Sequence, residues 1–219
     1  MPEFGVVFDM DGVIMNSNPY HERAWKKFCK AHNIMLADEE FHHYIFGRIA
    51  KDTIDYIFKK DHTMAEVNRY VDEKELIYRE MYAQNIKLLE GLYSFLEELQ
   101  RRNIPVAIAT SAPKDNVEFV FKYLPISHFF KFVLDASDIE KGKPDPEIYI
   151  RVIRKLGIPP NRCIVFEDSL SGIKSALAAG AKVIGVATTH RPEEFDGVKW
   201  VIENFVDLHY DHLFSILNE

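Results

Sequence analysis

The chain has 219 residues, of which 47% are hydrophobic and 28% charged, and its formal net charge is −7. This length suits one sizeable domain, or one domain that carries a smaller one, and the hydrophobic fraction excludes a disordered chain. The negative charge argues against a nucleic-acid partner, because phosphate backbones are bound by basic surfaces. A small phosphorylated ligand is compatible with it, since such a ligand needs only a few local cations or a metal ion.

The two cysteines, Cys29 and Cys163, lie far apart and match no metal-binding or redox spacing. We expect both to be buried, reduced thiols, which is typical of the cytosol. No window approaches the apolar length of a membrane span. The first apolar stretch is interrupted by Asp9 and Asp11, so it does not resemble a signal peptide. We therefore expect a cytoplasmic protein with no membrane partner.

Six short apolar runs recur along the chain and are nearly continuous in apolar residues rather than alternating. This pattern is typical of strands buried on both faces of a parallel sheet. The runs are Gly5–Asp9, Pro105–Thr110, Phe132–Asp135, Cys163–Glu167, Lys182–Ala187 and Trp200–Glu203.

Segments with helix punctuation lie between most of these runs. Asp145 followed by Pro146 reads as an N-cap with proline at the first helical position, and Gly157 ends that helix. A second, alanine-rich helix is expected over 171–179, and a closing amphipathic helix over 207–217. Alternating strands and helices predict a doubly wound α/β core with a parallel, Rossmann-like sheet.

Residues 16–89 break this alternation, because they contain several helical patterns and no convincing strand. Asn18-Pro19 opens the first helix, and Thr63 to Glu66 forms a capping box before a long helix that runs through Tyr82. We therefore expect a core domain of residues 1–15 and 90–219 and an all-helical cap domain of residues 16–89. An insertion just after the first strand would overhang the carboxyl ends of the strands, which suits a lid.

Polar side chains follow several of the predicted strands where the strands end. They are Asp9 and Asp11, Thr110 and Ser111, Glu167 and Asp168, and also Lys143, which precedes a helix. In a parallel sheet these positions converge on one edge. Clustered carboxylates stay ionised only if a cation neutralises them, and oxygen ligands of this kind favour Mg²⁺. Together with a lysine and a hydroxyl, they supply what phosphoryl transfer needs, and one carboxylate can serve as the nucleophile.

Each feature also has a plain structural interpretation. Asp-Gly is a turn signal, Lys143 would by default be a solvated surface lysine, and Thr110-Ser111 or Glu167-Asp168 could begin a helix. The catalytic interpretation is favoured because all four features occur together and in order.

The segment Phe8-Asp9-Met10-Asp11-Gly12-Val13 resembles the first signature of the haloacid dehalogenase superfamily, in its phosphatase and phosphomutase branch. The resemblance continues through Thr110, through Lys143 in GKPDPEIY, and through Glu167-Asp168-Ser169 followed by Gly172-Ile173. It covers essentially the whole chain, and the helical insertion resembles the small cap of that family.

This resemblance implies a role for each matching acid. Asp9 would be the nucleophile and a Mg²⁺ ligand, and Asp11 the general acid and base, with its main-chain carbonyl also on the metal. Asp168 would be a metal ligand, and Glu167 would bind the metal directly or through a water. An aspartate at position 9 favours phosphate chemistry over dehalogenation.

The same resemblance places the transferring phosphoryl group at Thr110 and Lys143, and Lys143 would also offset the charge of Asp9. We expect further substrate contacts at Ser111, Ala112 and Lys114, which follow the second strand.

In the cap, beta-phosphoglucomutases carry a glycine followed three residues later by an arginine that grips the distal phosphate of the substrate. The corresponding run here is Gly47-Arg48-Ile49-Ala50-Lys51, so alanine stands at the arginine position, with Arg48 or Lys51 as candidate substrate contacts. His21 matches a hinge histidine of the phosphomutases, and a structural role and a catalytic role both stay open for it.

Three functions follow from these patterns. The first is a Mg²⁺-dependent phosphatase for a small metabolite of the sugar phosphate or pyrophosphate type, acting through an aspartyl phosphate. The second is a hexose phosphomutase, and the third is a non-catalytic binding member of the family. We expect the protein to be a monomer.

Overall fold

The structure is a computed structural model that describes residues 3–35, 37 and 50–218. It divides into two compact units, one of Met1–Asn16 with Ile86–Glu219 and the other of Ser17–Asn85. The sequence-based boundaries of the core were 15 and 90, so the observed division falls one and four residues away from them.

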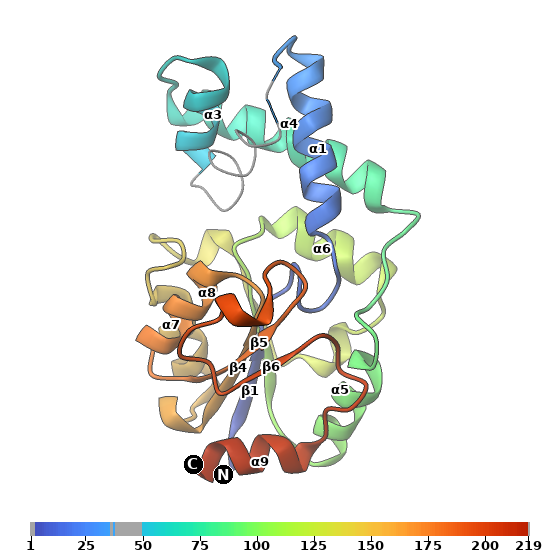
Figure 1. The fold of residues 1–219 in the computed structure, drawn as a ribbon, viewed down its shortest axis with the longest axis vertical. Coiled ribbons are helices and arrows are strands. Elements are labelled where there is room, and N and C mark those ends of the chain that lie inside the picture. The colour runs from blue at the N-terminus through green and yellow to red at the C-terminus, as the bar shows by residue number, and fades with distance from the viewer. Residues whose placement is uncertain (1–2, 36, 38–49, 219) are drawn as a thin grey trace. The chain divides into compact units, whose positions relative to one another are not determined.

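The larger unit contains a sheet of six parallel strands in the order β3-β2-β1-β4-β5-β6 (Figure 1). The six apolar runs are confirmed as strands; β4 matches its run, and the other five are one or two residues shorter than theirs. The strands are β1 Gly5–Phe8, β2 Val106–Ala109, β3 Val133–Leu134, β4 Cys163–Glu167, β5 Lys182–Val186 and β6 Trp200–Ile202. The chain moves outward from β1 to β3 and then returns to the other side of β1. Open α/β sheets bind their ligands at the carboxyl ends of strands beside such a reversal.

Helices cover both faces of this sheet. The helices α7 and α8 pack against the strands from one side, and α5 lies on the other (Figure 1). The helices of this unit are α5 Leu92–Arg101, α6 Lys114–Tyr123, α7 Glu147–Leu156, α8 Leu170–Ala178 and α9 Tyr210–Asn218, with short 3₁₀ turns at Ser127–Phe129, Ala136–Asp138, Pro160–Arg162 and Pro192–Glu194. This arrangement confirms the expected doubly wound α/β fold.

Alternate residues of β1 serve the two faces, because successive side chains of a strand point in opposite directions. Val7 belongs to a buried cluster with residues of α7 and α8. Phe8 faces the other way and stacks on Phe166 of β4, with ring centroids 5.0 Å apart, and Phe95 of α5 lies 6.4 Å away at a steep angle. The end of β1 is therefore held by packing on both sides.

Two helices begin one residue away from their expected starts. Asp145 is not the N-cap of α7, as the sequence had indicated, because Pro146 takes that position with ψ near 0°. The Asp145 carboxylate still accepts the N–H of Glu147 at 3.0 Å, so it satisfies a free donor of the first turn. Helix α8 begins at Leu170 because the Ser169 side chain accepts the N–H of Gly172.

The smaller unit is helical over its described residues, with α1 Asn18–Ala31, α3 Ala50–Phe58 and α4 Met64–Tyr82. The predicted capping box is confirmed: the Thr63 hydroxyl accepts the N–H of Glu66, and the Glu66 carboxylate accepts the N–H of Thr63. Helix α4 packs against both α1 and α3. Their shared core consists of Phe28, Cys29, Ile54, Ile57 and Val67.

Two further expectations concern the whole chain. Cys29 and Cys163 are both buried and unpaired, as expected. Burial raises the pKa of the Cys29 thiol to about 11 and that of Cys163 to about 12, so neither is a thiolate at neutral pH. Among the described helices, none combines the length and the apolar character that crossing a membrane requires.

Candidate active site

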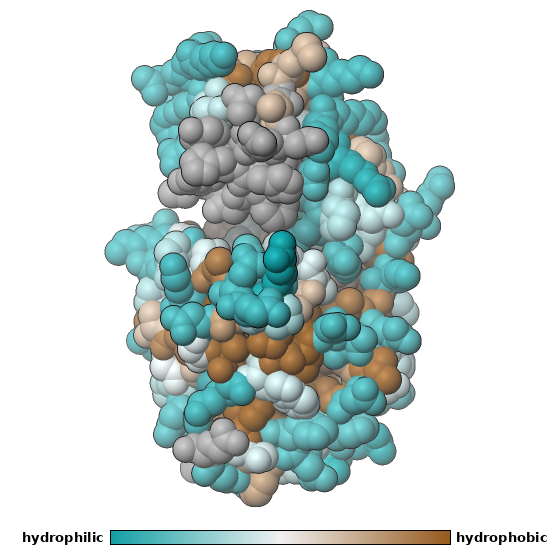
Figure 2. Space-filling model, in the orientation of Figure 1, coloured by the Kyte–Doolittle hydropathy of each residue, from teal (hydrophilic) through white to brown (hydrophobic). Residues whose placement is uncertain are grey.

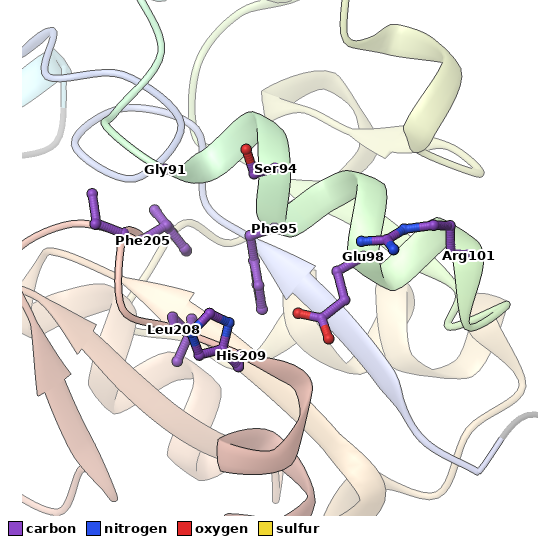
Figure 3. Close-up of a pocket in the computed structure, with 9 residues that line it drawn as sticks. Gly91, Ser94, Phe95, Glu98, Arg101, Phe205, Leu208 and His209 are labelled. Atoms are coloured by element: carbon purple, nitrogen blue, oxygen red, sulfur yellow. The ribbon is translucent and has the colours of Figure 1, made fainter.

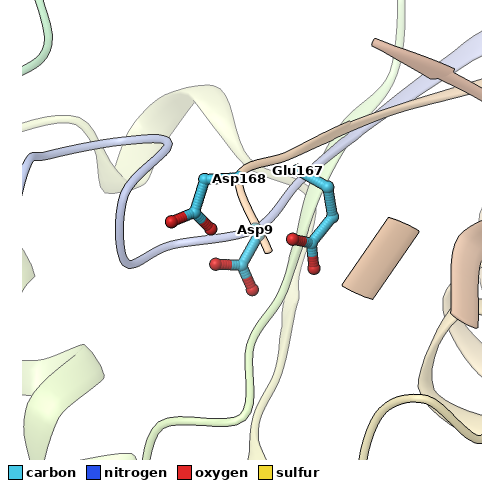
Figure 4. Close-up of side chains that lie close together, drawn as sticks. All are labelled: Asp9, Glu167 and Asp168. Carbon is cyan, nitrogen blue, oxygen red and sulfur yellow. The ribbon is translucent and has the colours of Figure 1, made fainter. Parts of the chain in front are cut away.

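Three carboxylates lie side by side where β1 and β4 end (Figure 4). The two strands are in register, with Phe8 opposite Phe166, and Asp9 N–H donates to the carbonyl of Phe166 at 3.0 Å. This register brings Asp9 beside Glu167 and Asp168, and one carboxylate oxygen from each lies within 4.8 Å of those of the other two. All three side chains are buried.

The ammonium group of Lys143 lies between two of these carboxylates. Its Nζ is 2.6 Å from Asp9 Oδ1 and 2.6 Å from Glu167 Oε1, and the side chain is only 6% exposed. Lys143 is therefore no solvated surface lysine. Its peptide bond to Pro144 is cis.

The charges of this cluster do not balance within the protein. Three carboxylates and one ammonium leave two negative charges uncompensated if all are ionised. Burial lowers the pKa of Lys143, but the carboxylates of Asp9 and Glu167 outweigh this effect and hold its pKa well above the usual value. Burial raises the pKa of Asp9; Lys143 opposes this rise, and the carboxylates of Glu167 and Asp168 add to it. Burial, reinforced by Glu167, raises the pKa of Asp168 to about 7.

A divalent cation fits this donor set in both charge and chemistry. Mg²⁺ prefers oxygen ligands and typically binds one or two carboxylates while keeping waters for a phosphate to replace. Within the described part of the chain, Asp9, Glu167 and Asp168 are the group of side chains close enough together to share a metal ion.

We expect the metal-free protein to lose stability as the pH rises toward 7. Because the pKa of Asp168 is raised from 3.8 to about 7, the folded state keeps a proton that the unfolded chain releases near pH 4. The free energy of unfolding should therefore fall between about pH 4 and pH 7 and level off above pH 7. Mg²⁺ should bind more tightly as the pH rises through this interval, because a decreasing fraction of Asp168 carries the competing proton. Thermal unfolding in EDTA and in Mg²⁺ at each pH measures both effects. Asp168→Asn should flatten the dependence, and an unchanged slope in this variant would contradict the assignment.

Asp11 lies in the turn that follows β1, where it forms an isolated bridge with Met15. Gly12 has φ of +79°, a left-handed conformation that glycine adopts without strain, and its N–H donates to the carbonyl of Met15 at 2.8 Å. The Thr188 hydroxyl donates to the carbonyl of Gly12 at 2.6 Å. Asp11 is partly exposed and close enough to Asp168 for its charge to raise the pKa of that residue.

Thr110, which was expected to hold the phosphoryl group with Lys143, follows β2 together with the other expected substrate contacts. Thr110 is buried, and its hydroxyl accepts the N–H of Ala112 at 3.0 Å, which curls the backbone at the strand end. This segment does not cap α6, because that helix begins later with Pro113 as its N-cap. Ser111 is exposed, and Lys114 is a surface residue that pairs with Glu118 at 3.7 Å. The structure thus places Thr110 at the sheet edge and leaves Lys114 in solvent.

In the helical unit, His21 contacts a lysine that the sequence did not single out. Lys74 is buried, and its Nζ lies 2.9 Å from His21 Nδ1 and 2.7 Å from Glu75 Oε1. An ammonium group can only donate, so His21 Nδ1 accepts in this contact. The His21 ring also stacks on Tyr78 at 3.8 Å. Lys51 pairs with Asp55 on its own helix, and Arg48 lies outside the described residues.

Sequence reasoning missed two residues that contact the carboxylate cluster. The Thr189 hydroxyl donates to Asp168 Oδ2, and the Tyr149 hydroxyl donates to Glu167 Oε1 at 2.8 Å. Thr189 follows β5, so the rule that singled out Thr110 would have found it. Tyr149 lies within the apolar face of α7, where an aromatic residue is indistinguishable from ordinary core.

A separate hollow of about 410 Å³ opens between α5 and the segment after β6 (Figure 3). Its lining residues are Gly91, Ser94, Phe95, Glu98, Arg101, Phe205, Val206, Leu208 and His209. Apolar residues also gather on the face of this unit seen in Figure 2. None of the lining residues belongs to the carboxylate cluster, so this hollow is not the candidate active site.

Comparison with known proteins identifies the family to which the chain belongs. Residues 6–186 match the family model described as haloacid dehalogenase-like hydrolase. The chain is 33% identical to hexitol phosphatase A of Escherichia coli over 91% of both chains, and 28% identical to beta-phosphoglucomutase of Bacillus subtilis over 83% of this chain and 82% of that one. A crystal structure of a HAD hydrolase, family IA, variant 3 from Entamoeba histolytica superimposes with a TM-score of 0.93 at 33% identity, with all of both chains covered. The chain belongs to the haloacid dehalogenase-like hydrolase family.

Proposed function

We propose that this protein is a Mg²⁺-dependent phosphatase that hydrolyses a small phosphorylated metabolite through an aspartyl phosphate on Asp9. The observation that carries this proposal is the buried ammonium of Lys143, held 2.6 Å from Asp9 beside two further carboxylates at the strand ends. Phosphoryl transfer needs such concentrated positive charge around a positioned nucleophile. The names of several relatives, among them hexitol phosphatase A, support a phosphorylated sugar as the substrate.

In the first step, a carboxylate oxygen of Asp9 bonds to phosphorus while the bond from phosphorus to the substrate oxygen breaks. Asp11 gives its proton to that leaving oxygen. In the second step, Asp11 takes a proton from a water whose oxygen bonds to phosphorus, and the Asp9 carboxylate is released together with inorganic phosphate. Mg²⁺, held by Asp9, the Asp11 carbonyl and Asp168, would supply positive charge to the phosphoryl oxygens.

The remaining residues would bind the substrate. Thr110 and Lys143 would hold the phosphoryl group, with Ser111, Ala112 and Lys114 beyond them. His21, Arg48 and Lys51 are the candidate contacts for the rest of the substrate. Choice among substrates would then depend on these residues, while the chemistry would stay with the sheet edge.

A panel of phosphate compounds tests the proposal. We expect the purified protein to release inorganic phosphate from at least one hexose phosphate, pentose phosphate, nucleotide, phosphoglycolate or pyrophosphate in Mg²⁺. EDTA should abolish the release and added Mg²⁺ should restore it. The absence of turnover on the whole panel would instead favour a non-catalytic binding protein.

A phosphomutase is the second candidate, because the chain is similar to beta-phosphoglucomutase of Bacillus subtilis. A mutase would isomerise a hexose phosphate when primed with the corresponding bisphosphate and would release little phosphate. Following both phosphate and the isomer in one reaction separates the two functions. We favour the phosphatase because Ala50 stands where the phosphomutases carry an arginine.

A further inference from the structure

Glu167 is held by four hydrogen bonds from the protein itself. Its Oε1 accepts from Lys143 Nζ at 2.6 Å and from the Tyr149 hydroxyl at 2.8 Å. Its Oε2 accepts from the Ser169 N–H at 3.0 Å and from the Ser169 hydroxyl at 3.0 Å. A carboxylate offers about four acceptor positions, so these donors use its capacity. The side chain is fully buried, with no exposure to water.

The surroundings of Glu167 fix this carboxylate in place. Tyr149 is fully buried on α7, and its ring lies 4.9 Å from the Lys143 ammonium. On the other side, the first turn of α8 passes so close that a Cβ atom on Gly172 would lie 1.7 Å from Glu167 Oε1. Glycine is therefore required there for this carboxylate position, which leaves Glu167 no room to move toward α8.

The contact with Glu167 also positions Lys143. Its ammonium group bonds to Glu167 on one side and to Asp9 on the other. When a phosphoryl group forms on Asp9, the carboxylate charge at that oxygen is lost, and a lysine held by Asp9 alone would lose its anchor. The bond to Glu167 does not depend on the state of Asp9.

We propose that Tyr149 is a positioning residue for phosphoryl transfer. Together with Ser169, it orients the Glu167 carboxylate so that this carboxylate binds Lys143 rather than the metal. This inference rests on the proposed function and extends it, because it assigns Glu167, the last residue of β4, and Asp168, which follows it, to different tasks. Asp168 binds the metal, and Glu167 positions the Lys143 ammonium.

Tyr149→Phe tests this assignment because it removes one hydroxyl and leaves every charge in place. Orthovanadate, which resembles the phosphoryl group, reports on Lys143, and isothermal titration calorimetry with Mg²⁺ alone reports on the metal site. We expect kcat to fall about tenfold and vanadate affinity, measured in saturating Mg²⁺, to weaken about tenfold, the size of a lost hydrogen bond to a charged group. The affinity for Mg²⁺ should stay within about twofold of wild type.

Tyr210→Phe is the matched control. Tyr210 lies on α9, and its hydroxyl donates to the Glu3 carboxylate at 3.3 Å, so this variant also removes a hydroxyl that bonds a carboxylate. It should change none of these quantities, and melting temperatures of both variants should show that they fold. If Tyr149→Phe weakens Mg²⁺ binding tenfold or more, as loss of a residue that orients a metal ligand does, Glu167 serves the metal and the proposal is wrong. If neither affinity changes, Tyr149 is only a core residue.

The two proposals fail in different ways. If the wild-type protein turns over no phosphate compound, the proposed phosphatase function fails. The Mg²⁺ and vanadate titrations need no turnover, so they still decide the role of Tyr149.

Discussion

Replacing Asp9 by asparagine is expected to lower kcat for phosphate release by about 10⁴-fold or more, the scale on which enzymes lose activity with their nucleophile. The amide keeps the shape of the side chain, and its oxygen can still accept a hydrogen bond from Lys143. It is a far weaker nucleophile than a carboxylate, so no phosphoryl group can be carried at this position. Substrate binding should persist, which makes the loss appear in kcat rather than in KM.

The measurement is phosphate release at saturating substrate and Mg²⁺, together with acid quenching of wild-type enzyme on a ³²P-labelled substrate to trap labelled protein. Asp196→Asn is a suitable control, since it makes the same change at an exposed position of the same unit. An Asp9→Asn enzyme that keeps a tenth of the wild-type rate would remove Asp9 from the role of nucleophile.

Replacing Lys143 by methionine is expected to damage both activity and stability. Its ammonium lies between Asp9 and Glu167 and is only 6% exposed, so its loss leaves two buried carboxylates without their partner. Removing one member of a buried ion pair costs about 3–5 kcal/mol of unfolding free energy. Loss of a group that stabilises transition-state charge lowers kcat by about 10²–10³-fold. Mg²⁺ should restore part of the stability, because it supplies positive charge to the same carboxylates.

Urea denaturation in EDTA and in Mg²⁺ measures the stability change, and steady-state kinetics measures kcat. Lys141→Met is the matched control: that lysine is 72% exposed and pairs with Asp145 at 3.8 Å. Exposed pairs contribute about 0–1 kcal/mol, so the control should unfold close to wild type. Equal stability of the two variants would show that the buried pair does not hold the site together.

The sheet and its reactive edge were predictable because both follow from local sequence rules. Strands buried on both faces have nearly continuous apolar sequences. A polar residue directly after such a sequence lies at the carboxyl edge of the parallel sheet. Asp9, Glu167 and Asp168 were found in this way, and the register of β1 with β4 explains why they meet. The helical insertion was visible for the same reason, from its spacing and from the Thr63 capping box.

Contacts that depend on tertiary packing were not predictable. Tyr149 occupies a core position of α7, and nothing local indicates that its hydroxyl meets a carboxylate 18 residues further along the chain. Lys74 is equally hidden, because a lysine on a helix is normally solvated, whereas here His21 and Glu75 surround it. The start of α7 was misplaced by one residue because Asp145 bonds the first turn without being its N-cap.

Because Gly172 lies so close to Glu167, the residues allowed at position 172 depend on the residue at position 167, and the reverse. A side chain at position 172 would occupy the space of the glutamate oxygens, so any larger residue there requires that Glu167 be displaced or replaced by a shorter acid. A shorter acid would in turn fall back from the Lys143 ammonium and from the Tyr149 hydroxyl. Substitutions at 167 and 172 should therefore appear jointly among related sequences, or not at all, and a mutational scan that varies one position at a time would find both intolerant.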